Sequence, residues 1–239
     1  MGIRRHIPNA ITSMNLLCGV LGVIFTFEGR FDQAFFLMIA AAVFDFLDGF
    51  AARLLGAYSD MGKELDSLAD MVSFGVLPSV MLVNLMSAMN FARSAWDLIP
   101  VVIAVASGLR LAKFNVDERQ SHSFLGLPTP ACAMVCGSLC YFISCEPASF
   151  LSVWALGHVF IPVLSVVLAA LLVSETPMFS LKFSREDDRA LRSKRLSLLV
   201  SAAIIVAVVA LTGQHWSLAV LLTFVVYILM NVCFRLFRV

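Results

Sequence analysis

The chain has 239 residues, of which 60% are hydrophobic and 14% are charged, and its mean hydropathy is +0.92. These values exclude an ordinary soluble globular domain, in which about 25% of residues are charged. The formal net charge of +1 gives no reason to expect a nucleic-acid partner. The composition instead predicts an integral membrane protein, with membrane lipid as its surroundings.

Long apolar stretches divide the chain into helices. A spanning helix needs about 20 apolar residues, and the stretch 196–234 is long enough for two, separated by turn-like residues at 212–215. The basic tip at the N-terminus resembles a signal peptide, but no small-x-small cleavage site follows it, so we interpret this segment as the first span. We predict an all-α, polytopic membrane helix bundle of about eight transmembrane helices: 8–27, 33–54, 66–90, 97–115, 128–145, 150–173, 196–212 and 216–234.

The basic residues predict an orientation. With the N-terminus inside, fifteen of the seventeen Lys and Arg residues fall on the cytoplasmic side, and only Arg30 and Arg93 fall outside. We therefore expect a multi-pass protein of the cell (inner) membrane with both termini in the cytoplasm. The basic segment 182–195 is interpreted either as facing anionic headgroups or as a plain cytoplasmic retention signal.

The acidic residues are concentrated in one part of this greasy chain, because six of the sixteen lie between Phe44 and Gly75. Residues spaced three or four apart share one face of a helix. Two such stripes flank a turn at 56–60: Asp45, Asp48, Gly49, Ala52 and Arg53 before it, and Gly62, Asp66, Asp70 and Ser73 after it. Two antiparallel helices would bring the four stripe aspartates together at the cytoplasmic end of the bundle.

Four neighbouring carboxylates repel one another, and a low dielectric strengthens that repulsion. Each aspartate at the centre of a membrane helix costs roughly 2.5–3.5 kcal/mol. Only Arg53 and Lys63 are close in sequence, too few to neutralise the group. Hard divalent cations such as Mg²⁺ or Mn²⁺ suit carboxylate oxygens, and four carboxylates have room for two. The pattern therefore predicts two divalent cations.

Small residues beside the acids predict a ligand. Gly49 and Ala52 remove side chains from the acidic face, so a bulky group can lie against the backbone, and Arg53 offers a planar donor fork suited to phosphate. Together with the cations these residues predict a diphosphate site. Asp60 and Glu64 are interpreted instead as helix-capping or solvated acids.

The cysteines and histidines show no pattern of a metal or catalytic site. Cys132, Cys136 and Cys140 lie on one helical face without metal-site spacing, so we interpret them as buried apolar residues. The four histidines are scattered, and we interpret them as structural or interfacial.

The eight specified residues in Asp45-x2-Asp48-Gly49-x2-Ala52-Arg53-x8-Gly62-x3-Asp66-x3-Asp70 resemble, without a gap, the signature of the CDP-alcohol phosphatidyltransferase family. Four further segments resemble its phosphatidylserine synthase branch: IPNAITSMNLLCG (7–19), ELDSLADMVSFGVLP (64–78), LRLAKFNV (109–116) and FLGLPTPA (124–131). The resemblance covers at least the first 131 residues.

The resemblance implies transfer of a phosphatidyl group from CDP-diacylglycerol to L-serine, with release of CMP. It implies that one cation is held by Asp45, Asp48 and Asp66, and the second by Asp66 and Asp70. Asp70 would also be the base that accepts the proton of the alcohol. The residues implied to line the CDP site are Gly49, Ala52, Arg53 and Gly62, with Thr12 and Asn15 reaching the nucleotide.

Because serine is zwitterionic, its pocket should offer both signs of charge. Arg110, near the inner end of the fourth helix, is our candidate contact for the serine carboxylate or a phosphate; anchoring of the helix by Arg110 and Lys113 at the membrane surface is the alternative. The resemblance further implies a six-helix core and a homodimer. We divide the chain into a core (1–175), a basic cytoplasmic connection (176–195) and an additional C-terminal helix pair (196–239).

Three alternatives remain at this stage. The same chemistry with glycerol phosphate or inositol phosphate as acceptor would call for more basic residues near the site than Arg110 and Lys113. A UbiA-like prenyltransferase would carry its acidic motifs on well-separated helices. A cation transporter would place acids on broken helices near the bilayer midplane, and it has no use for the stripe of small residues.

Overall fold

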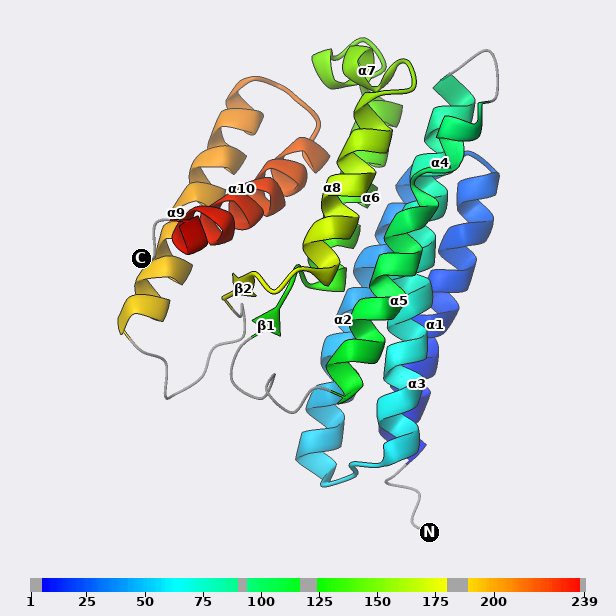
Figure 1. Cartoon of the computed structure of the whole chain (residues 1–239), viewed down its shortest axis with the longest axis vertical. Helices are drawn as coiled ribbons and strands as arrows, with labels where there is room; N and C mark the ends of the chain where they lie inside the picture. Colours follow the sequence, from blue (N-terminus) through cyan, green and yellow to red (C-terminus); the bar gives the residue numbers. More distant parts are fainter. Residues whose placement is uncertain (1–5, 90–93, 117–123, 180–188, 237–239) are drawn as a thin grey trace.

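The structure is a computed structural model that describes residues 6–89, 94–116, 124–179 and 189–236. In these ranges the chain folds into an upright bundle of helices with one short antiparallel pair of strands (Figure 1). The elements are α1 (His6–Phe27), α2 (Phe31–Leu55), α3 (Asp60–Asp70), the π-helical segment η2 (Met71–Val76), α4 (Leu77–Met89), the 3-10 turn η3 (Ala95–Leu98), α5 (Val101–Val116), β1 (Phe124–Leu125), α6 (Thr129–Cys145), α7 (Phe150–Ala155), α8 (Phe160–Val173), β2 (Pro177–Met178), α9 (Arg189–Leu211) and α10 (Ser217–Leu236).

The prediction of an all-α polytopic membrane bundle is confirmed. Six helical segments in the described part of the chain are long and apolar enough to cross a membrane: His6–Phe27, Phe31–Leu55, Asp60–Met89, Ala95–Val116, Leu191–Leu211 and Ser217–Arg235. The shorter apolar helices α6 and α8 occupy the two remaining predicted positions. The chain is therefore a multi-pass membrane protein. Several residues used for the orientation, namely Arg4, Arg5, Arg93, Arg119, Arg238 and those of 182–188, lie outside the described ranges.

Several predicted boundaries are wrong. The helix predicted over 196–212 begins at Arg189, because the basic residues before the apolar stretch continue the same helix, and the helix predicted over 97–115 is divided into η3 and α5. The single helix expected over 150–173 is interrupted between α7 and α8, where Leu156 is extended and Gly157 takes a φ of 96°, a conformation that favours glycine. The third helix begins at Asp60 rather than at 66, because the side chain of Ser59 caps it and accepts a hydrogen bond from the Gly62 N–H at 3.0 Å.

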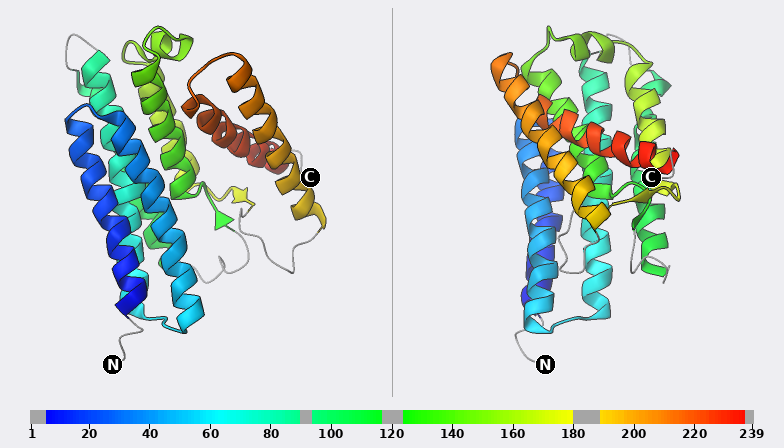
Figure 2. Two further views of the ribbon diagram at one scale, coloured as in Figure 1. Left: turned by 180° about the vertical axis from the view of Figure 1, so that it is seen from behind. Right: turned by 90° about the vertical axis from the view of Figure 1, so that its left-hand side faces the viewer.

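The helices differ in reach along the bundle. The N-terminal end of α1, the α2–α3 turn and the C-terminal end of α5 project together at one end (Figure 1). The helices α6 and α8 stop short of this end, and the β1–β2 pair lies beside their tips (Figure 1). At the C-terminus, α10 packs against α6 and α9 and runs obliquely to the bundle (Figure 2).

Glycines allow the central helices to approach closely. An added Cβ at Gly19 of α1 would lie 2.9 Å from the backbone Cα of Ser73 in η2. An added Cβ at Gly137 of α6 would lie 2.8 Å from the ring of Phe35 in α2. Because α6 is buried along most of its length, Cys132, Cys136 and Cys140 are fully enclosed free cysteines, as predicted.

The close approach of α1 to η2 generates a prediction about stability. Replacing Gly19 with Ala should destabilise the fold by about 1–3 kcal/mol, because the new methyl group meets backbone rather than a movable side chain. The measurement is thermal unfolding of the detergent-solubilised protein. The matched control is Gly49→Ala in α2, where no atom lies within 4 Å of the added Cβ; equal melting temperatures for the two variants would contradict the proposed packing.

Candidate active site

The tight connection between α2 and α3 sets the geometry of the site. Gly56 ends α2 in the left-handed conformation with a φ of 58°, and its N–H and that of Ala57 bond the carbonyls of the last helical turn. Three residues later Asp60 starts α3. Two antiparallel helices joined by so short a turn must place their facing stripes side by side.

Three of the four stripe aspartates meet across this helix pair. Asp45 and Asp48 of α2 and Asp66 of α3 each offer a carboxylate oxygen, and the three oxygens lie within 4.8 Å of one another. Asp48 is buried, and the other two are half-buried. Such a set of hard oxygen donors matches the preference of Mg²⁺ and Mn²⁺. The donor chemistry of these residues therefore fits a divalent cation.

Asp70 lies deeper, one helical turn beyond Asp66. Its side chain is buried, and the carboxylates of Asp45, Asp66 and Asp48 are all within electrostatic range of it. It also receives a hydrogen bond of 3.1 Å from the Nδ2 of Asn15 in α1. All four stripe aspartates therefore lie in the same region, and three of them are close enough together to bind one cation.

The first helix supplies neutral polar partners for these acids. The Oγ1 of Thr12 donates to the Oδ2 of Asp48 at 2.6 Å and also contacts the Pro8 carbonyl at 3.0 Å. Asn15 is fully buried, and its Oδ1 accepts no hydrogen bond from the described residues. These contacts show that α1, which carries no carboxylate here, orients the carboxylates of the other two helices.

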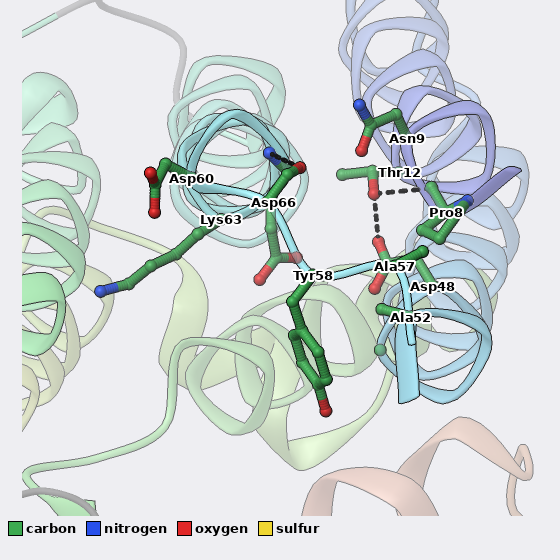
Figure 3. A pocket seen from close by; sticks show the side chains of 13 residues that line it. Pro8, Asn9, Thr12, Asp48, Ala52, Ala57, Tyr58, Asp60, Lys63 and Asp66 are labelled. Carbon is green, nitrogen blue, oxygen red and sulfur yellow. Dashed lines mark hydrogen bonds between the residues drawn. The ribbon is translucent and has the colours of Figure 1, made fainter. Parts of the chain in front are cut away.

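A cavity of about 540 Å³ opens beside the acidic group. Its walls include Thr12, Asp48, Gly49, Ala52, Gly62 and Asp66, all singled out by the sequence. In Figure 3 the side chains of Thr12, Asp48 and Asp66 lie around one opening between α1, α2 and α3. Because nothing lies within 4 Å of an added Cβ at Gly49, that glycine leaves open space rather than room for another helix. A ligand can therefore reach the α2 backbone.

Several other predicted residues lie away from this cavity, whereas Asp60 and Lys63 contribute to its lining. Arg53 is exposed in the last turn of α2 and does not line it. Neither do Asp45, Asn15 and Asp70, which lie deeper. The Lys63 side chain turns aside in Figure 3, and its Nζ donates to the carbonyl of Asn115 in α5 at 3.0 Å. Glu64 is exposed, and Asp60 is exposed in the first turn of α3, in line with the helix-end interpretation.

Arg110 borders a second cavity of about 310 Å³. This cavity is also lined by Lys113 of α5, by Leu125 of β1 and by Ser174, which follows α8. Arg110 is buried, its Nη1 contacts the Thr129 Oγ1 at 3.5 Å, and its Nε has no hydrogen-bond partner in the described structure. The Asp70 carboxylate lies within electrostatic range of Arg110. Arg110 thus lies between the acidic group and the second cavity.

Two features of the site escaped the sequence reasoning. The π-helical segment η2 starts directly after Asp70 and interrupts what the apolar pattern predicts as one regular helix; π segments are frequent at functional sites. Glu175, which forms an ion pair with Lys113 at 3.2 Å, follows α8 in an ordinary loop. Apolar periodicity carries no signal for either.

A membrane-embedded helix bundle with clustered carboxylates beside a cavity defines a class of intramembrane sites whose donor groups fit a divalent cation. The sequence profile of the CDP-alcohol phosphatidyltransferase family matches residues 5–170, and the chain belongs to this family of transferases. Membership settles the class against a prenyltransferase and against a cation transporter.

Three of the curated relatives carry the same activity name. The chain is similar to the CDP-diacylglycerol–serine O-phosphatidyltransferases of Bacillus subtilis (36% identical over 130 residues), Methanocaldococcus jannaschii (34% over 138) and Mycobacterium leprae (35% over 181). These matches cover 54%, 58% and 72% of this chain. They span 72% of the first relative but only 62% and 57% of the other two.

The three-carboxylate cluster generates a prediction about metal binding. Replacing Asp66 with Asn should raise the melting temperature of the metal-free protein, because it removes a like charge. It should also abolish the additional stabilisation by Mn²⁺, which amounts to about 2.7 kcal/mol at a concentration 100 times the dissociation constant. Thermal unfolding with and without Mn²⁺ measures both effects. Glu64→Gln, an exposed acid of the same helix, is the control and should behave as wild type; an undiminished Mn²⁺ shift in Asp66→Asn would contradict the assignment.

Proposed function

We propose that the protein transfers the phosphatidyl group of CDP-diacylglycerol to L-serine, giving phosphatidylserine and CMP. The observation that carries the proposal is the cation-sized carboxylate cluster opening directly onto a cavity whose floor is Gly49. Family membership supports the CDP-alcohol donor, and the names of the relatives support the serine acceptor. The activity that the relatives' names describe thus has a site in this chain with suitable chemistry.

The residues proposed for the donor substrate surround the first cavity. Gly49, Ala52, Gly62 and Thr12 line this cavity and would surround the CDP group. Asn15 and Arg53 are proposed as further nucleotide or phosphate contacts from beyond the lining of the cavity. Asp45, Asp48 and Asp66 would hold one Mg²⁺ or Mn²⁺, and Asp66 with Asp70 a second. Bound there, the cations would neutralise the diphosphate and stabilise the departing CMP.

Asp70 is proposed as the base. Serine attacks the phosphorus that carries the diacylglycerol: a bond forms between the serine hydroxyl oxygen and that phosphorus, the bond from phosphorus to the CMP oxygen breaks, and the hydroxyl proton passes to Asp70. Asn15 holds the Asp70 carboxylate by its 3.1 Å hydrogen bond, which fixes the direction in which the other oxygen faces. Burial of Asp70 keeps bulk water from competing with serine as the nucleophile.

The second cavity is proposed as the acceptor subsite. Arg110 has an unpartnered buried N–H, which the serine carboxylate would satisfy. Lys113 shares the cavity, but Glu175 pairs with it at 3.2 Å, so the local charge is close to one positive unit. A site of both signs with a small net charge suits a zwitterion better than a doubly charged phosphate. This favours serine over glycerol phosphate or inositol phosphate.

The membrane location follows from the substrate. The acyl chains of CDP-diacylglycerol stay in lipid while the headgroup enters the cavity at the end of the bundle that carries the α2–α3 turn. We propose that this end and both termini face the cytoplasm of the cell (inner) membrane, as the basic residues indicate. We also propose a homodimer, which the family resemblance implies.

The base assignment predicts the effect of Asp70→Asn. Asn keeps an oxygen that can accept from Asn15 but cannot take the serine proton. Transfer should fall by at least about 100-fold, while binding of CDP-diacylglycerol should remain close to normal. Product formation and equilibrium binding of the donor lipid are measured on the purified variant. Near-normal turnover would eliminate Asp70 as the base.

The cavity floor predicts the effect of Gly49→Ala. The added methyl group meets no protein atom within 4 Å, so the variant should fold and be as stable as wild type or more so, since Ala favours helix by about 1 kcal/mol over Gly. Activity should nevertheless fall by roughly 10- to 200-fold, because the methyl group occupies space needed by the substrate. Full activity in a stable Gly49→Ala protein would show that the donor does not lie against α2.

The acceptor assignment is tested by offering serine, glycerol phosphate and inositol phosphate in turn to purified protein with CDP-diacylglycerol and Mn²⁺, and identifying the lipid formed. Serine should be the acceptor used. Glycerol phosphate should compete with serine as an inhibitor, and it should inhibit Glu175→Gln more strongly than wild type, by roughly 1.5- to 5-fold at low salt. This is the effect expected from losing one partly exposed ion pair, which leaves Lys113 free to attract the phosphate. The control is Glu146→Gln at the C-terminal end of α6, which should leave the inhibition by glycerol phosphate unchanged. Transfer to glycerol phosphate in preference to serine would refute the acceptor assignment.

A further inference from the structure

A short segment between α8 and the C-terminal helices, residues 174–179, begins at the proposed acceptor cavity; we name it the strap. Ser174 lines the cavity, and Glu175 pairs with Lys113 at 3.2 Å. The strap contains β2, which pairs with β1, and the carbonyl of Thr176 accepts from the Gly126 N–H at 2.9 Å. The strap therefore supplies one lining residue of the cavity and the acidic partner of Lys113, which lies across from it on α5.

The last helix holds the strap by hydrogen bonds to its backbone. Asn231 of α10 accepts from the Phe179 N–H through Oδ1 at 2.9 Å, and the Tyr227 hydroxyl donates to the Phe179 carbonyl at 3.0 Å. Arg235 donates to the Thr176 Oγ1 at 2.5 Å. The bonds from Asn231 and Tyr227 satisfy both the N–H and the carbonyl of Phe179, as a neighbouring β-strand would do. They therefore fix the position of the strap.

The two anchoring side chains are themselves rigid. Tyr227 and Asn231 are each 2% exposed, and the Asn231 Nδ2 donates to the Tyr227 carbonyl at 2.7 Å. The Tyr227 ring packs edge-on against the Phe179 ring with centroids 5.2 Å apart. The Tyr227 phenol also lies within electrostatic range of the Arg110 guanidinium. One buried residue of α10 is thus linked both to the strap and to the cation of the acceptor cavity.

The far end of α10 is fixed by a separate contact. His215 and Trp216, directly before the helix, pack edge-on against Tyr141 of α6 with ring centroids 4.7 Å and 5.6 Å away. Trp216 also lies 6.0 Å from the ring of Phe35 in α2. Because both of its ends are attached, α10 connects the core of the bundle to the strap.

The strap and α10 lie beyond the part of the chain that the family profile matches, which ends at residue 170. The same 130 residues make up 54% of this chain and 72% of the Bacillus subtilis relative, so that relative is the shorter protein. Residues outside the shared part are not expected to perform the shared chemistry. They are free to adjust how a substrate is held.

We propose that Tyr227 and Asn231 are positioning residues for the acceptor: through Phe179 they hold the strap against α5 and so set the affinity of the Arg110–Lys113 cavity for the serine carboxylate. This proposal rests on the proposed function. Neither residue touches the reacting atoms; each acts through the strap, so its loss should alter the KM for serine and leave donor binding and cation binding unchanged.

The test compares Tyr227→Phe and Asn231→Leu with Thr223→Val in purified protein. Tyr227→Phe removes only the hydroxyl that donates to the strap, whereas Asn231→Leu removes the amide that bonds both the strap and α10. Thr223 lies on the same helix, and within the described residues its hydroxyl bonds to the Ala219 carbonyl of α10 alone, at 2.7 Å. The KM values for serine and for CDP-diacylglycerol, kcat, and the Mn²⁺-induced shift in melting temperature are measured for each.

The KM for serine should rise by about threefold in Tyr227→Phe and about tenfold in Asn231→Leu, the range expected for losing one and two hydrogen bonds. The KM for CDP-diacylglycerol and the Mn²⁺ shift should match those of Thr223→Val. An unchanged KM for serine, or a parallel loss of all parameters with a lower melting temperature, would overturn the positioning role. If Asn231→Leu fails to fold, Tyr227→Phe decides alone. A wild-type protein that transfers nothing to serine would instead refute the proposed function.

Discussion

Repulsion among carboxylates in a poorly polar environment is the constraint on which the structure around the site depends. Asp45, Asp48 and Asp66 present oxygens within 4.8 Å of one another, and Asp70 lies buried within range of all three. Packing alone would separate such groups, because like charges in a low dielectric repel strongly. The fold holds them together through a tight α2–α3 turn, and a bound divalent cation is the natural means of offsetting the repulsion.

The side chains that hydrogen-bond to the carboxylates are neutral, so the carboxylates keep their negative charge for binding a cation. Thr12 and Asn15 of α1 orient Asp48 and Asp70 by hydrogen bonds without forming ion pairs with them. A lysine or arginine in either position would neutralise a carboxylate and compete with a cation for it. The nearby Lys63 is instead bound to the Asn115 carbonyl of α5. At the second cavity, Lys113 is likewise paired, in this case with the carboxylate of Glu175.

Asp70 and Arg110 relate the two cavities: Arg110 borders the smaller one, and Asp70 lies one helical turn beyond Asp66, which lines the larger one. The larger lies against α1, α2 and α3 beside the acidic cluster, and the smaller lies between α5 and the strap. Since Asp70 and Arg110 are within electrostatic range of each other, a group in the smaller cavity lies close to the acid proposed as the base. A donor and an acceptor can thus approach one locality from two sides, which is what a transfer reaction requires.

The apolar pattern of the sequence was sufficient to predict an all-α membrane bundle and the position of nearly every helix, because a segment that spans lipid must be both long and apolar. The pattern missed the break at Gly157 and the π segment after Asp70, since both depend on backbone geometry that leaves hydropathy unchanged. Helical spacing likewise placed Asp45 with Asp48 on one face and Asp66 with Asp70 on another, because such pairs lie within one helix.

By itself, then, the sequence determined the class of protein, the helices and the two acidic stripes, all of which are local properties of the chain. Only the tertiary structure decided that three carboxylates share one cation-sized space, that Arg53 does not line the cavity and that Arg110 borders a second one. The pairing of Glu175 with Lys113 and the attachment of α10 to Phe179 were also decided there. These contacts join residues from about 50 to more than 60 positions apart. Their geometry depends on how whole helices pack, which no local pattern records.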